Sequence, residues 1–225
     1  MKILTQSRRA GYWLRATAAS VVLACVMPAS ASPTDAADNR PVILFVGTSL
    51  SAGFGLPLEQ AFPALIQEKI DRDGYEYRVV NAGVSGDTSA GGLRRIVWLL
   101  RSHVSILVLE LGANDMLRGL DPGDMLKNLV KIIDRTRAAY PNVKLLIAGM
   151  RAAPNLGSKY SDQFEQAFHH LAEIYDAPLI PFLLEDVAAR PELNQVDGIH
   201  PTAEGHALVA ERVWEKLVGL LNDEK

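Results

Sequence analysis

The sequence is almost free of cysteine. Its one cysteine, Cys25, lies in the N-terminal segment, so the rest of the chain can form no disulfide. The histidines and acids form no cluster with the spacing of a metal site, and we therefore expect neither a metal nor another cofactor. The stability of the fold must come from its core, and 48% of the residues are apolar, which allows a substantial one.

The N-terminal segment also lacks an apolar run long enough to cross a membrane. The run at 16–27 is shorter than the roughly 20 residues that a transmembrane helix needs. It follows four basic residues and no acid, and it precedes Ala29-Ser30-Ala31, an order typical of a secretory signal peptide. We therefore expect residues 1–31 to be a signal peptide cleaved near Ala31, the mature protein to have no membrane span, and export to the periplasm or the medium.

Two short motifs leave the export route open. Val-Leu-Ala-Cys at 22–25 resembles a lipoprotein cleavage box, which would anchor the protein through Cys25. Ser7-Arg8-Arg9 resembles part of a twin-arginine signal. Neither motif is specific, so a plain signal peptide remains our interpretation.

Positive charge is scarce once the signal peptide is removed. The cleavage takes away four basic residues and no acid, which leaves 19 Lys and Arg against 26 Asp and Glu and a formal charge of −7. An acidic protein repels the phosphates of nucleic acids, so we exclude a nucleic-acid partner. A small-molecule substrate is the partner we expect, and the sequence does not indicate an oligomeric state.

Residues 32–40 are small and polar and predict a flexible lead-in, followed by one folded domain at 41–225. In this domain, apolar runs of strand length alternate with longer amphipathic stretches, a pattern typical of βαβ units. The pattern predicts an α/β fold in which helices cover a parallel sheet. The expected strands are 42–46, 77–81, 105–109, 144–148 and 178–180, and the expected helices lie near 59–72, 89–101, 123–139, 161–175 and 203–221.

The residues that follow each strand are the first place to look for chemistry, because open parallel sheets bind ligands beyond the carboxyl ends of their strands. The first strand is followed by a turn of small residues that contains Ser49, a candidate nucleophile. The second is followed by Gly86, where a ligand can approach the backbone N–H. Both have a plainer interpretation, since such residues are common in turns and helix caps.

Two further motifs occupy comparable positions. Asn114 follows the third strand, and its amide could donate to an oxyanion, although a loop asparagine more often bonds its own backbone. Asp197 and His200 precede the last helix. One turn could set this carboxylate against the Nδ1–H of the imidazole and leave Nε2 free to take a proton from a serine. An Asp-x-x-His pair alone is common in surface loops, so it is the joint occurrence of the motifs that indicates a serine hydrolase.

Four blocks in this order, Gly-x-Ser-Leu, Ser-Gly-Asp-Thr-Ser, Gly-x-Asn-Asp and Asp-x-x-His-Pro, resemble those of the SGNH (GDSL-like) hydrolases. The resemblance spans residues 41–222 and implies a three-layer α/β/α, flavodoxin-like fold with a five-stranded parallel sheet. The chain is most similar to the bacterial branch of acyl-CoA thioesterases, lysophospholipases and arylesterases. This branch implies a serine esterase that hydrolyses acyl esters and thioesters.

The roles that the family assigns transfer by position. They imply Ser49 as the nucleophile, His200 as the base, Asp197 as the acid that orients it, and the Ser49 N–H, the Gly86 N–H and the Asn114 amide as oxyanion donors. The resemblance also implies that the loop at 151–160 binds substrate. Its candidate contacts are Pro154, Asn155, Leu156 and Gly157.

The first block departs from the usual Gly-Asp-Ser-Leu of the family. Thr48 stands where the aspartate would be. Threonine keeps a hydroxyl that can bond locally but carries no charge, so we expect the change to affect the geometry of the loop and to leave the reaction intact.

Two other functions remain as alternatives, and a third is excluded. Related enzymes remove acetyl groups from carbohydrates, and the sequence does not separate this activity from the release of longer acyl chains. A flavodoxin-like binding module could hold a flavin phosphate in the turn after the first strand, but Asn114 and the Asp197–His200 pair would then have no role. An ordinary α/β-hydrolase lipase is excluded, because Ser49 follows the first strand and the second glycine of the nucleophile elbow is missing.

Overall fold

The computed structural model describes residues 38–221, so the predicted signal peptide lies outside the described residues, as does most of the lead-in. Five strands form one parallel sheet in the order β2-β1-β3-β4-β5. This is the strand order of flavodoxin-like doubly wound proteins, and it confirms the predicted fold class. The strands are β1 (Val42–Gly47), β2 (Arg78–Asn81), β3 (Val104–Glu110), β4 (Lys144–Ala148) and β5 (Leu179–Ile180).

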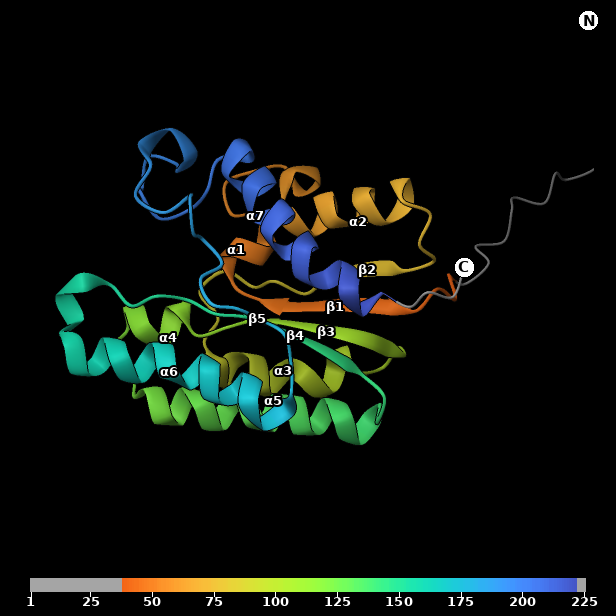
Figure 1. The fold of residues 1–225 in the computed structure, drawn as a ribbon, viewed down its shortest axis with the longest axis horizontal. Coiled ribbons are helices and arrows are strands. Elements are labelled where there is room, and N and C mark those ends of the chain that lie inside the picture. The colour runs from red at the N-terminus through yellow and green to blue at the C-terminus, as the bar shows by residue number, and fades with distance from the viewer. Residues whose placement is uncertain (1–37, 222–225) are drawn as a thin grey trace, which may run out of the picture. The chain divides into compact units, whose positions relative to one another are not determined.

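Helices cover both faces of the sheet (Figure 1). The longer ones match the predicted helices. One face is covered by α2 (Phe62–Arg72) and α7 (Ala203–Leu217), and the other by α3 (Ser89–Leu99), α5 (Pro122–Ala139) and α6 (Ser158–Tyr175). Four 3₁₀ turns lie at Leu58–Gln60, Pro154–Leu156, Pro191–Leu193 and Val218–Leu220.

Two short helices were not predicted from the sequence. They are α1 (Ser49–Ala52) and α4 (Ala113–Leu117), which begin directly after β1 and almost directly after β3. At four and five residues, they are too short for a hydrophobic periodicity to reveal them. Both carry residues of the candidate site.

The core lies between the sheet and its two helical layers. Strand β1 is buried at all six positions, as expected for a strand covered on both faces, and this explains its unbroken apolar run. On the α2 side, Phe45 packs against Phe62 with ring centroids 5.7 Å apart. In α6, Phe164 and Phe168 make an edge-to-face pair at 5.3 Å. The rigid sheet therefore fixes the ends of β1 and β3, from which the site is built.

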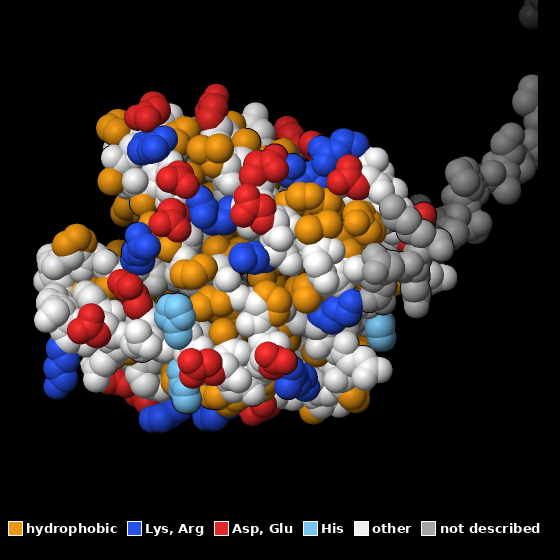
Figure 2. Space-filling view, viewed as in Figure 1, with side chains coloured by type: hydrophobic (Ala, Val, Ile, Leu, Met, Phe, Trp, Pro, Cys, Tyr) orange, Lys and Arg blue, Asp and Glu red, His pale blue; other side chains and the backbone are white. Residues whose placement is uncertain are grey.

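The surface of this domain mixes its charges. Figure 2 shows acidic and basic side chains interspersed over one face, with neither sign gathered into a patch. No helix within residues 38–221 is long and apolar enough to cross a membrane.

Candidate active site

The structure brings together Ser49, His200 and Asp197. The Oγ of Ser49, at the start of α1, lies 2.9 Å from Nε2 of His200, although 151 positions separate the two residues. The other ring nitrogen of His200, Nδ1, lies 2.6 Å from Oδ2 of Asp197. In this arrangement the imidazole can take the hydroxyl proton while the carboxylate fixes the ring and stabilises its positive charge.

A tight turn holds Asp197 against His200. Its Oδ1 accepts the backbone N–H of Ile199 at 2.9 Å and of His200 at 3.0 Å, and Gly198 provides the left-handed backbone (φ 69°) that the turn requires. The hydrogen bonds from the His200 backbone and ring, followed by that from Ile199, lower the pKa of Asp197 to about 2. The carboxylate therefore stays ionised through the neutral and mildly acidic range. The His200 ring packs against Phe54, with ring centroids 4.5 Å apart.

A buried carboxylate, which sequence reasoning missed, lies beneath the nucleophile turn. Glu110 ends β3 and is 1% exposed. It accepts four hydrogen bonds, from the N–H (2.8 Å) and hydroxyl (2.8 Å) of Thr48 and from the N–H (3.2 Å) and hydroxyl (2.8 Å) of Ser51. Burial raises the pKa of Glu110, and these hydrogen bonds oppose the rise. An acid at the end of an otherwise apolar strand is the signal that could have found it.

Thr48 connects this carboxylate to α1. Its Oγ1 donates to Glu110 and also accepts the N–H of Leu50 at 3.4 Å, so the side chain is the N-cap of the helix that starts at Ser49. An aspartate here would bring a second carboxylate toward Glu110. The threonine instead supplies a donor, which explains how the departure from the usual family block fits the loop.

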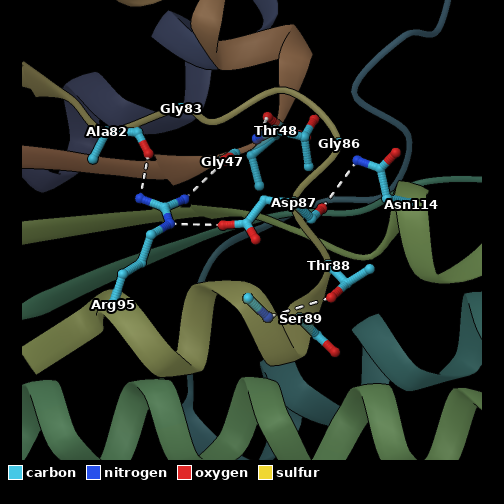
Figure 3. Close-up of polar contacts among 12 residues, drawn as sticks. Gly47, Thr48, Ala82, Gly83, Gly86, Asp87, Thr88, Ser89, Arg95 and Asn114 are labelled. Carbon is cyan, nitrogen blue, oxygen red and sulfur yellow. Dashed lines mark hydrogen bonds and ion pairs between the residues drawn. The ribbon is translucent and has the colours of Figure 1, made fainter.

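The three predicted oxyanion donors converge on one cavity of about 610 Å³. Within residues 38–221, the N–H groups of Ser49 and Gly86 donate to no protein acceptor. The amide of Asn114 donates one hydrogen to the carbonyl of Asp87 at 3.0 Å, which orients it toward the Gly86 turn (Figure 3). Its second hydrogen stays available. The cavity can therefore offer three donors to an oxyanion.

The rest of this cavity is mainly apolar. Side chains at the ends of different elements line it, among them Phe54, Leu117, Met150, Phe182 and Ile199. Sequence reasoning missed Phe54 and Phe182 as cavity residues, because each lies in a segment without a recognisable motif. The wall favours an apolar group on the ligand.

The predicted substrate loop contributes only part of this wall. Pro154 lines the cavity, together with Met150 and residues 151–153 before it. Asn155, Leu156 and Gly157 are not among the lining residues. Leu156 lies partly buried against the hydrophobic core.

Across the described part of the chain, no three His, Cys, Asp or Glu side chains form a group that could hold a metal ion. The other histidines of the described residues make no hydrogen bond with Ser49. His206, for example, lies on the buried face of α7 and accepts the backbone N–H of Phe62 at 3.2 Å.

Comparison with known proteins identifies the family. Residues 45–208 match the model of the GDSL-like lipase/acylhydrolase family. The chain belongs to this family. Esterase TesA of Pseudomonas aeruginosa is 41% identical over 180 residues, which are 80% of this chain and 89% of that protein. Thioesterase 1/protease 1/lysophospholipase L1 of Escherichia coli is 38% identical over 183 residues, which are 81% of this chain and 86% of that protein.

Solved structures of GDSL-like hydrolases agree with the fold. The crystal structure of TesA superposes with a TM-score of 0.76 at 40% identity, covering 80% of this chain and 99% of the other. AlinE4, an SGNH-hydrolase family esterase, gives a TM-score of 0.66 at 41% identity, with 81% and 97% covered. The family resemblance, the fold and the activity on ester bonds that the sequence predicts are confirmed, and the chain is a hydrolase of ester bonds.

Proposed function

We propose that this hydrolase cleaves acyl esters and thioesters through an acyl-enzyme on Ser49, with His200 as the base and Asp197 as its orienting acid. The observation that carries the proposal is the continuous chain of contacts from Ser49 Oγ through the imidazole to the carboxylate, at 2.9 and 2.6 Å. Ser49 and His200 line a cavity to which Gly86 and Asn114 also contribute.

The first half of the reaction forms the acyl-enzyme. Ser49 Oγ attacks the acyl carbonyl while its proton passes to Nε2 of His200. The carbonyl oxygen becomes an oxyanion that accepts from the Ser49 and Gly86 N–H groups and from Asn114. The intermediate then collapses with cleavage of the bond to the leaving oxygen or sulfur, which takes the proton from Nε2 and departs as the alcohol or thiol.

The second half releases the acid. A water molecule gives a proton to His200 and attacks the acyl carbon, and the same three donors stabilise the second oxyanion. Collapse breaks the bond to Ser49, whose Oγ regains the proton. Asp197 stays charged throughout, because its pKa is held at about 2, and it stabilises the imidazolium that forms in each half.

The apolar wall of the cavity supports an acyl chain longer than acetyl as the preferred substrate. Relatives named for esters, aryl esters, thioesters and lysophospholipids support the same class. Each buried methylene adds up to about 0.8 kcal/mol, so kcat/KM should rise over several carbons until the chain outgrows the cavity. A preference for acetylated carbohydrates would instead support the alternative drawn from the sequence.

The test combines a nucleophile variant with a substrate series. Ser49→Ala should lose nearly all activity, and a fluorophosphonate probe should label Ser49 in the unmodified enzyme. Ser85→Ala is the matched control, because Ser85 lines the same cavity but it is Ser49 that contacts His200. Rates on p-nitrophenyl esters from acetate to laurate, an acyl-CoA and an acetylated sugar give the substrate class. Full activity in folded Ser49→Ala would overturn the mechanism.

We also propose export of the enzyme, which rests on the signal-like sequence of residues 1–31. Cleavage near Ala31 predicts a mature protein that begins close to Ser32. N-terminal sequencing of the protein from its native host would test this, and a lipid-modified Cys25 at the first position would support the lipoprotein route instead.

A further inference from the structure

The side chain of Arg95 on α3 ties together three segments around the oxyanion site (Figure 3). Its Nε donates to Oδ2 of Asp87 at 2.7 Å, Nη1 to the carbonyl of Ala82 at 2.5 Å, and Nη2 to the carbonyl of Gly47 at 3.0 Å. The arginine and aspartate side chains are 21% and 12% exposed. One largely buried guanidinium thus joins the end of β1, the exit of β2 and the turn before α3.

Two of the three joined segments carry or orient proposed oxyanion donors. Gly47 precedes Ser49 by two residues, and Asp87 directly follows Gly86. The carbonyl of Asp87 accepts the amide of Asn114 at 3.0 Å. A displacement of Asp87 would therefore move one donor and release the acceptor that orients another.

The packing leaves this ion pair little freedom. The carbonyl of Gly47 accepts hydrogen bonds from the N–H of Val84 and from Arg95. The segment after β2 and the guanidinium therefore bind the same carbonyl at the end of β1. A Cβ at Gly91 would approach Oδ1 of Asp87 to 1.6 Å, so the carboxylate lies directly on the first turn of α3. Only glycine fits there, and the contact fixes where Asp87 can lie.

We infer that Arg95 and Asp87 are positioning residues that hold the Ser49 N–H, the Gly86 N–H and the Asn114 amide in one arrangement. Neither side chain is among those that line the cavity, so both act through the backbone and through Asn114. The inference rests on the proposed function, since it concerns the reaction of Ser49. Donors that stabilise the transition state alone change kcat and leave KM alone.

The experiment compares Arg95→Met, Arg95→Lys and Asp87→Asn with a control ion pair. Arg95→Met should lower kcat on a p-nitrophenyl ester by roughly 10- to 100-fold with KM within about twofold, because misplaced donors cost transition-state stabilisation. Arg95→Lys keeps the ion pair but cannot reach both carbonyls, and its loss should be intermediate. The double variant Arg95→Met/Asp87→Asn should lose little more than the worse single variant, as expected for groups that act as a unit.

Lys69 provides the control, since it pairs with Glu211 between α2 and α7, on the other face of the sheet (Figure 1). Even if Lys69→Met lowers Tm as much as Arg95→Met does, it should change kcat less than twofold. Rates are normalised to the folded fraction, so that Arg95→Lys and Asp87→Asn still decide the matter if Arg95→Met folds poorly. Unchanged kcat per folded enzyme, or a loss that appears in KM, would overturn the inference. Full activity of Ser49→Ala would instead overturn the proposed function.

Discussion

Two loop regions of the candidate site are built in opposite ways. Ser49, Gly86 and Asn114 follow the ends of β1, β2 and β3, and buried polar side chains hold the neighbouring turns in place. Glu110 and Asp115 are both at most 2% exposed, and Asp115 accepts the N–H and hydroxyl of Ser89 at 2.8 and 2.6 Å. The loop with Asp197 and His200 instead ends the segment 181–202 between β5 and α7, whose one helical piece is the 3₁₀ turn at Pro191–Leu193.

The second region lies largely at the surface. Val196 is fully exposed and Ile199 is half exposed. Asp186 and Ala189, in the same segment, have positive φ angles of 65° and 63°, a conformation that costs non-glycine residues free energy. Few buried contacts hold this loop, so its geometry depends on individual hydrogen bonds.

Gln195 makes several of those hydrogen bonds. Its backbone N–H donates to the carbonyl of His200 at 2.7 Å. Its side-chain amide donates to the carbonyls of Phe54 at 2.7 Å and Pro201 at 2.9 Å, so it joins the base loop to the loop that follows α1. The comparison teaches that changes in the buried region should act on stability first, and changes in the exposed loop on rate first.

The largest expected effect tests the buried region. Glu110→Leu removes the acceptor of two N–H groups and two hydroxyls, and each buried donor left alone costs about 1–3 kcal/mol. The free energy of unfolding should fall by several kcal/mol, measured by urea or thermal unfolding. Glu110→Gln is the matched control, because its oxygen can replace Oε2, which accepts three of the four bonds. Equal stability of Glu110→Leu and the wild type would show that the buried carboxylate does not hold this region in place.

The next effect concerns His206, the buried histidine behind the base loop. Burial, with a smaller contribution from the charge of His200, lowers the pKa of His206 to about 4, below the roughly 6.5 of an unfolded chain. A depressed pKa means that the contribution to stability is full above about pH 6.5 and is lost as the pH falls toward 4. The loss should reach roughly 3 kcal/mol near pH 4.

Unfolding free energies between pH 7 and 4 measure this effect. His206→Gln keeps an acceptor for Phe62 but cannot titrate, so its stability should fall less steeply with acid than that of the wild type. His170→Gln, at an exposed position, should follow the wild-type curve. Parallel curves for all three proteins would contradict the assignment.

The exposed loop should show the reverse behaviour. Gln195→Met removes both side-chain hydrogen bonds and keeps the volume, so His200 should lose its fixed distance from Ser49. We expect kcat to fall by roughly tenfold, because small misplacements of catalytic groups are costly, while Tm changes by less than about 3 °C. A large fall in Tm with unchanged kcat per folded enzyme would show that this loop is held like the buried region.

The same contrast explains what could be predicted from the sequence. Strands such as β1 and β4 show as apolar runs because both faces of the sheet are covered, and the motif with Ser49 stands at the end of β1. Asp197 and His200 instead precede α7, and their three-residue spacing is what allowed them to be proposed from the sequence. Contacts that depend on long-range packing could not be proposed in this way, such as Arg95 with Gly47 or Gln195 with Phe54. No local spacing encodes them.

The smallest expected effect concerns Thr48, where this chain departs from the usual family block. Thr48→Val removes the N-cap and one donor to Glu110, and it should cost about 1–2 kcal/mol at every pH.

Thr48→Asp restores a cap but places a second carboxylate beside a buried one. Two acids that share a site raise the pKa of one of them, and a raised pKa means stability that is present in acid and lost as the pH rises. The Asp variant should therefore weaken relative to Thr48→Val between about pH 5 and 8, by roughly 1 kcal/mol. Unfolding curves of both variants across this range decide the point. If their difference does not change with pH, the Asp side chain has turned away from Glu110, and the threonine is not needed to keep a second charge out of the buried region.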